Sequence, residues 1–224
     1  IEGKSAEDRA ALQAAYMSYA NQQYADDHNI DVSQVKSGSV MNLEDKIKDD
    51  FNYTGDGSND HMFTVGKNYE GDIALGLLHG DDVAVKAARL EEASDGWFFG
   101  GGTDEKAILT QLKDNNLQAP VPPSDPTASN YQEQMAIYEQ KKAAHDKAVA
   151  DRAQLRVLYA ERYNRSIETM IGEEMGTGSD DYMGELARQT LDKGDGDRTL
   201  KIKAATDGFG TNEDLIKEAL TDSA

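Results

Sequence analysis

Hydrophobic and polar residues follow one another along this chain with the spacing of amphipathic helices. Leu12, Tyr16 and Tyr19 illustrate that spacing in the first of them. Runs of β-branched residues, which favour strands, are scarce, whereas Ala, Leu, Glu, Lys and Gln are common. The pattern predicts an all-α fold of about ten helices. They are expected at Ser5–Asp26, Asn42–Phe51, Tyr69–His79, Asp82–Ser94, Asp104–Asp114, Tyr131–Asn164, Ser166–Met175, Asp180–Asp192, Arg198–Thr206 and Asn212–Asp222.

One predicted helix is much longer than the others. The stretch Tyr131–Asn164 contains neither glycine nor proline, so nothing in it interrupts a helix. All prolines of the chain precede it and indicate a linker: Pro120, Pro122, Pro123 and Pro126. Its segment Gln140–Asp151 is rich in Ala and Lys and has little apolar surface. We therefore expect this half of the helix to project into solvent.

Short matches between distant segments indicate an internal repeat. Tyr69–Ala74 resembles Tyr182–Ala187, Arg9–Leu12 with Tyr16 resembles Arg152–Leu155 with Tyr159, and Gly100–Glu105 resembles Gly208–Glu213. Any one match could arise by chance, but together they predict a duplicated helical unit with insertions of unequal length.

The charge of the chain restricts its partners. It carries a net charge of -19 over 224 residues, which argues against nucleic-acid binding and against direct contact with anionic lipid. Acidic loops could hold hard cations through oxygen ligands; the alternative is that the charge serves solubility alone. The chain has no cysteine, so disulfides and thiol catalysis are excluded and composition leaves the compartment open. No transmembrane segment or signal peptide is evident, and the start at Ile1 suggests a soluble piece of a longer protein.

No pattern predicts an enzyme. The chain has no nucleophile motif, phosphate-binding loop or dinucleotide fingerprint. The four histidines have no metal-ligand spacing: His28, His61, His79 and His145. The aspartates of Asp192–Asp197 lack the spacing and the terminal Glu of an EF-hand, so a turn is expected there.

A Gly-x-Gly-Thr motif followed by acidic residues occurs twice, ending at Thr103 and at Thr211. In structural terms it is a helix start, with each threonine as N-cap and the acids on the favourable end of the helix dipole. The residues around both motifs carry a further resemblance. Ile202–Ile216 resembles the opening of an annexin repeat, and Gly102–Leu109 matches the same start. Leu158–Ile167 resembles the junction of that family's third and fourth helices.

The resemblance to annexins, whose repeats have five helices, implies three parts. Residues 1–81 would be the third to fifth helices of a first repeat. Residues 82–192 would be a complete repeat with an insertion at about 116–150, in which Tyr182–Leu191 resembles the fifth helix. Residues 193–224 would be the first two helices of a further repeat.

The resemblance also implies calcium binding. Annexins hold calcium through carbonyls of the glycine loop and a carboxylate near the end of the fourth helix, a position that Glu174 takes here. The implied ligands are Phe98, Gly100, Gly102, Thr103 and Glu174. If the incomplete ends of the chain meet, a second site would join Asp50 to Gly208, Gly210 and Thr211. For the first site, the alternative is that Glu174 simply ends a helix in solvent.

Three adjacent aromatic residues, Trp97, Phe98 and Phe99, precede the first glycine loop. They either pack beneath the loop or reach outward into lipid. The function implied by the resemblance is calcium-dependent binding to acidic phospholipid membranes. The alternatives are a structural or assembly module, packing on other domains of a larger parent protein or on a second copy, and a delivery or attachment segment of a secreted protein.

Overall fold

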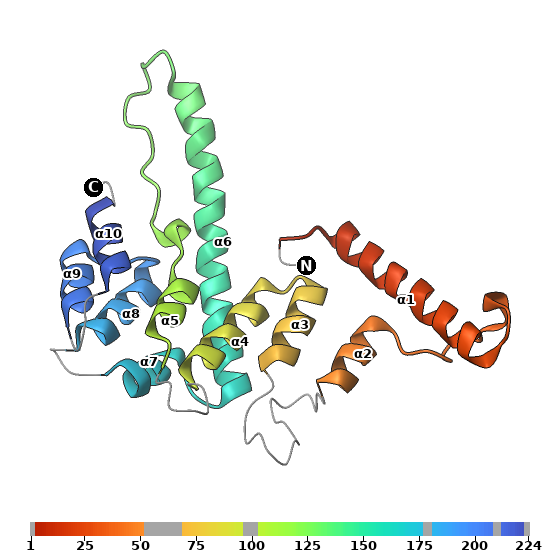
Figure 1. The fold of residues 1–224 in the computed structure, drawn as a ribbon. Coiled ribbons are helices and arrows are strands. Elements are labelled where there is room, and N and C mark those ends of the chain that lie inside the picture. Colours follow the sequence, from red (N-terminus) through yellow and green to blue (C-terminus); the bar gives the residue numbers. More distant parts are fainter. Residues whose placement is uncertain (1–2, 52–68, 96–102, 177–180, 208–211, 222–224) are drawn as a thin grey trace. The chain divides into compact units, whose positions relative to one another are not determined.

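The structure is a computed structural model that describes residues 3–51, 69–95, 103–176, 181–207 and 212–221. These residues form α-helices and two short 3₁₀ turns, and no strand occurs among them (Figure 1), which confirms the predicted all-α class. The helices are α1 (Ala6–His28), α2 (Leu43–Asp50), α3 (Tyr69–His79), α4 (Asp82–Ser94), α5 (Glu105–Leu112), α6 (Tyr131–Tyr163), α7 (Ile167–Met175), α8 (Tyr182–Lys193), α9 (Arg198–Thr206) and α10 (Glu213–Thr221).

Capping residues set many of the helix ends. The Ser5 hydroxyl accepts a hydrogen bond from the Asp8 amide at 3.1 Å, which starts α1. Helix α6 ends at Asn164, whose φ of 53° is left-handed. The predicted N-cap of α5 was wrong by one residue, because the carboxylate of Asp104, and not Thr103, accepts the hydrogen bond from the Ala107 amide.

The chain divides into two compact units, residues 1–88 (unit 1) and 89–224 (unit 2), and the division falls within α4. In unit 1, Glu44 on α2 accepts hydrogen bonds from Lys48 at 2.6 Å and contacts His79 of α3 at 3.1 Å. The contact between Glu44 and His79 ties α2 to α3 and contributes modestly because it is partly exposed. The annexin-like repeat boundaries stay a prediction.

The core of unit 2 lies where α5, α8, α9 and α10 meet. Leu186 of α8 and Leu215 of α10 are buried in one hydrophobic cluster, against which Leu109 of α5 packs. Each fully buried side chain of this size contributes about 1.5–3 kcal/mol through burial of apolar surface. The same unit contains the candidate site described below.

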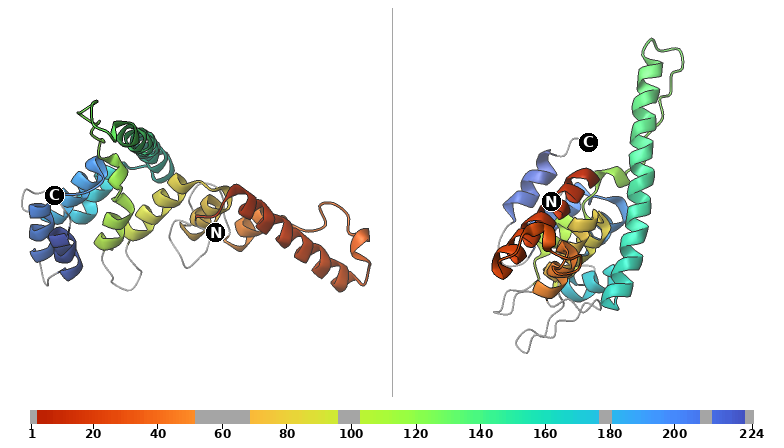
Figure 2. Two further views of the ribbon diagram at one scale, coloured as in Figure 1. Left: turned by 90° about the horizontal axis from the view of Figure 1, so that it is seen from above. Right: turned by 90° about the vertical axis from the view of Figure 1, so that its right-hand side faces the viewer.

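Helix α6 is the long helix that the sequence predicts. Its 33 residues span about 50 Å. Its second half is anchored by the buried side chains of Leu155 and Tyr159, whereas Ile137 in its first half is 47% exposed. The segment 118–130 runs beside its first half (Figures 1 and 2). The expected solvent exposure of Gln140–Asp151 is therefore confirmed for most of its residues, with Ala148 a buried exception.

None of the helices in the described ranges is both long and apolar enough to cross a membrane.

Candidate functional site

Thr103 and Glu174 lie side by side. The Thr103 hydroxyl donates a hydrogen bond of 2.7 Å to Oε2 of Glu174, although the two residues are 71 positions apart. Thr103 directly precedes the N-cap of α5, and Glu174 belongs to the last turn of α7. The long insertion between them therefore does not separate the two described residues that the annexin resemblance pairs as ligands.

The two helices that follow the glycine motifs begin with equivalent backbone contacts. The amide of Asp104, at the start of α5, donates to the carbonyl of Ala93 at 2.9 Å. The amide of Asn212, at the start of α10, donates to the carbonyl of Ala205 at 2.8 Å. Each helix start is thus tied to the end of the helix before the loop. The duplicated unit itself stays a prediction.

A close helix contact fixes the position of Glu174. Helix α7 ends before Gly176, which has a φ of +89° that favours glycine. A Cβ on Gly184 of α8 would lie 2.4 Å from the Gly176 carbonyl oxygen, so only glycine permits this approach. Arg188 of α8 also donates to that carbonyl at 3.1 Å. The end of α7 is therefore held firmly against α8.

Two carboxylates, Glu173 and Glu174, stand in the last turn of α7, which contains no basic residue. The C-terminal end of a helix carries partial negative charge, so acids there need a nearby cation. Arg165, just before α7, supplies it: its Nη1 lies 2.9 Å from Oε2 of Glu173 and 3.5 Å from Oε1 of Glu174.

The other side of Arg165 reaches a buried polar cluster. Its Nη2 lies 3.1 Å from Oε2 of Glu91 and donates to the Ser94 hydroxyl at 2.8 Å. Glu91 is fully buried, and the Tyr159 hydroxyl donates to the same carboxylate oxygen. Burial raises the pKa of Tyr159 from 10.0 to about 12, because the phenolate would lose its hydration.

Of the remaining predicted site residues, only Asp50 lies within the described ranges. Asp50 of α2 is ion-paired with Lys46 and its side chain is 54% exposed. The other candidates lie outside the described residues: Trp97, Phe98, Phe99, Gly100, Gly102, Gly208, Gly210 and Thr211.

The donor atoms at Thr103 and Glu174 suit a hard cation. They are oxygens, and the Glu174 side chain is partly buried, with 25% of its surface exposed. Within the described ranges, no group of three or more His, Cys, Asp or Glu residues could hold a metal ion. A calcium site here would depend on one carboxylate together with backbone carbonyls, and such a site is weak.

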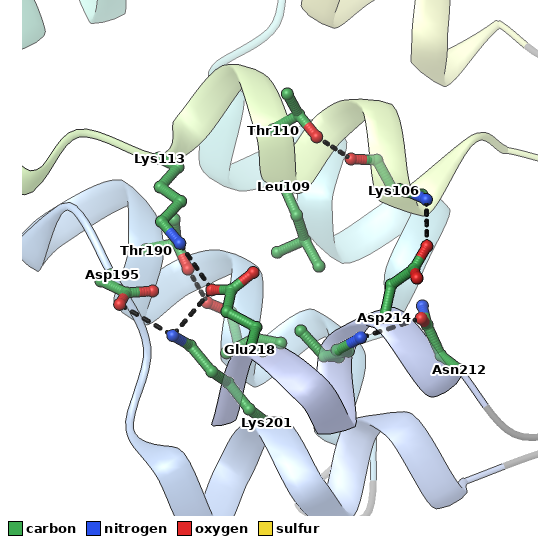
Figure 3. A pocket seen from close by; sticks show the side chains of 12 residues that line it. Lys106, Leu109, Thr110, Lys113, Thr190, Asp195, Lys201, Asn212, Asp214 and Glu218 are labelled. Carbon is green, nitrogen blue, oxygen red and sulfur yellow. Dashed lines mark hydrogen bonds and ion pairs between the residues drawn. The ribbon is translucent and has the colours of Figure 1, made fainter. Parts of the chain in front are cut away.

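A cavity of about 100 Å³ lies among α5, α8, α9 and α10 (Figure 3). Lys201 of α9 is almost fully buried there, with its Nζ 2.8 Å from both Asp195 and Glu218. Lys113 contacts the same Glu218 carboxylate at 2.6 Å. Sequence patterns did not reveal this network, since Lys113 joins it from a position 105 residues before Glu218. The ion pairs compensate the charged groups, so the cavity itself indicates no ligand.

No protein-family model, no curated protein sequence and no solved structure matches this chain. The annexin resemblance therefore rests on the residues quoted above.

Proposed function

We propose that the chain binds acidic phospholipid surfaces through calcium held at the first glycine loop. The hydrogen bond between Thr103 and Glu174 is the observation that supports this proposal most directly. The last residue of the glycine motif contacts the carboxylate implied as its calcium partner, although the two residues are 71 positions apart in the sequence.

Electrostatics explains why binding to an acidic membrane would require calcium. A chain with a net charge of -19 is repelled by an acidic membrane. A divalent cation that is bound by one carboxylate and a few carbonyls keeps open coordination positions. Lipid phosphate oxygens can fill those positions, so the metal bridges two negative surfaces.

The alternative function is a structural or assembly module without lipid binding. One observation favours it: the Glu174 carboxylate is engaged by Thr103 and Arg165, two partners within the chain itself. In that case these contacts only fasten the end of α7 to the start of α5, and calcium has no specific effect on the chain.

Titration calorimetry with calcium separates the two functions. Under the proposal the chain binds calcium with a Kd on the order of 10⁻⁴ M or weaker, and Glu174→Gln weakens that binding. Glu168→Gln is the matched control, because it removes the same charge from the first turn of the same helix, where Glu168 pairs with Arg156 at 2.8 Å. If both variants bind calcium equally more weakly than the parent, or if neither binds it more weakly, the assignment of Glu174 as a calcium ligand is contradicted.

A further inference from the structure

Arg165 stands between a buried anion and the proposed calcium ligand. Its side chain is 19% exposed, and the Glu91 carboxylate on its inner side is fully buried. On its outer side it lies 2.9 Å from Glu173 and 3.5 Å from Glu174. The guanidinium therefore places a fixed positive charge beside the carboxylate that a cation would have to use.

The contacts of Arg165 make this charge hard to displace. Its hydrogen bonds to Glu91 and to Ser94 hold Nη2 on the inner side. Moving it into solvent would break its ion pair with the fully buried Glu91 carboxylate, which is strongly unfavourable. When a divalent cation approaches Glu174, Arg165 thus remains nearby and repels it.

The contact to Glu174 is also the longest of the four polar contacts of Arg165 described here. Arg165 can lose the contact with Glu174 and still retain its contacts with Glu91, Ser94 and Glu173. The site is therefore not blocked, but its affinity is lowered by an immobile neighbouring charge.

We propose that Arg165 is an affinity-setting residue: it neutralises Glu174 in the metal-free protein and raises the calcium concentration needed to load the site. This inference rests on the proposed function, because it assumes that Glu174 is a calcium ligand. It assigns to Arg165 a role that a purely structural arginine would not have, since removal of a merely structural contact would not tighten metal binding.

Two variants in one background test the inference. Glu91→Gln removes the buried anion that draws Arg165 inward, while Gln can still accept the Tyr159 hydrogen bond. Arg165 then shifts toward Glu174, and calcium affinity is expected to fall about threefold. Glu91→Gln combined with Arg165→Gln removes the repelling charge without leaving a buried ion, and affinity is expected to rise about fivefold above that of the parent.

Calorimetric titration of calcium into the parent chain and both variants gives the affinities, and circular dichroism with thermal unfolding reports their fold without metal. Arg165→Lys keeps the positive charge but not the forked hydrogen bonds of the guanidinium, so it controls for the lost contacts and is expected to bind calcium no tighter than the parent. A double variant that binds no tighter than the parent, while the parent does bind, overturns the role of Arg165 and leaves the proposed function standing. If neither the parent nor any variant binds calcium, both proposals fail. If the double variant does not fold, Glu91→Gln decides alone: unchanged or tighter binding by that variant overturns the inference.

Discussion

Replacement of Lys201 by methionine should destabilise unit 2 far more than the same replacement at Lys106. Both lysines line the cavity of Figure 3 and both pair with carboxylates. The Lys201 side chain is only 2% exposed and holds Asp195 and Glu218, whereas Lys106 and its partner Asp214 are 68% and 66% exposed. The comparison therefore separates a buried ion pair from an exposed one.

The magnitude follows from burial. Removal of one partner of a buried pair costs about 3–5 kcal/mol. The loss at Lys201 is expected nearer to 2–3 kcal/mol, because Glu218 is partly exposed and keeps Lys113. For a chain of this length that corresponds to a fall in Tm of roughly 5–10 °C. For Lys106→Met we expect only a small change, since solvent screens the exposed pair.

The effect of Lys201 should also depend on pH. Burial alone would raise the pKa of Glu218, but hydrogen bonds from Lys113 and Lys201 outweigh it and leave this pKa below its ordinary value of 4.5. A depressed carboxyl pKa contributes stability above the ordinary value, and that stability is lost as the pH falls through the folded-state pKa. The difference between the parent and Lys201→Met should therefore shrink below about pH 4.5.

Thermal and urea unfolding of the parent and both variants, followed by circular dichroism at neutral and acidic pH, measures these differences. Lys106→Met is the matched control, because it removes the same charge from the same cavity. Equal shifts for the two variants, or a higher midpoint for Lys201→Met, would refute the reasoning from burial.

Three further predictions concern other parts of unit 2. Tyr159 should ionise near pH 12 in the folded chain, and its contribution to stability should be complete below pH 10 and lost as the pH rises through 12; ultraviolet titration of phenolate should lose this late step in Tyr159→Phe. Limited proteolysis should cut the helix-free segment 118–130, where Val121 is 86% exposed, before it cuts α5, where Ile108 and Leu112 are fully buried; earlier cleavage in α5 would contradict its place in the core. Trp97 is the only tryptophan, so if it contacts lipid, its emission should shift to the blue when calcium and acidic vesicles are added together, and an unchanged spectrum would favour packing beneath the loop.

The helices were largely predictable because their signals are local. The absence of Gly and Pro from the stretch Tyr131–Asn164 predicted the end of α6 to within one residue. The start of α5 was misplaced because Thr103 and Asp104 are both good N-caps. What separates them is tertiary: the Asp104 amide is bound to the Ala93 carbonyl, and the Thr103 hydroxyl is turned toward Glu174.

The site was predictable only in part. The pairing of Thr103 with Glu174 came from the resemblance to a known repeat, and the described structure brings these two residues into contact. Arg165 was not recognised as part of the site, since its partner Glu91 lies 74 positions earlier and nothing in the spacing of charged residues links the two. Such long-range ion pairs depend on how helices pack, which the periodicity of a single helix does not encode.

Cosedimentation with acidic phospholipid vesicles tests the central claim most directly. The parent chain, Glu174→Gln and the control Glu168→Gln are each mixed with phosphatidylserine-containing vesicles in millimolar calcium and, separately, in excess chelator. The proposed function predicts that the parent and Glu168→Gln sediment with the vesicles in calcium only, and that Glu174→Gln stays largely in the supernatant. Sedimentation of the parent that is equal with calcium and with chelator, or absent from both, would contradict it.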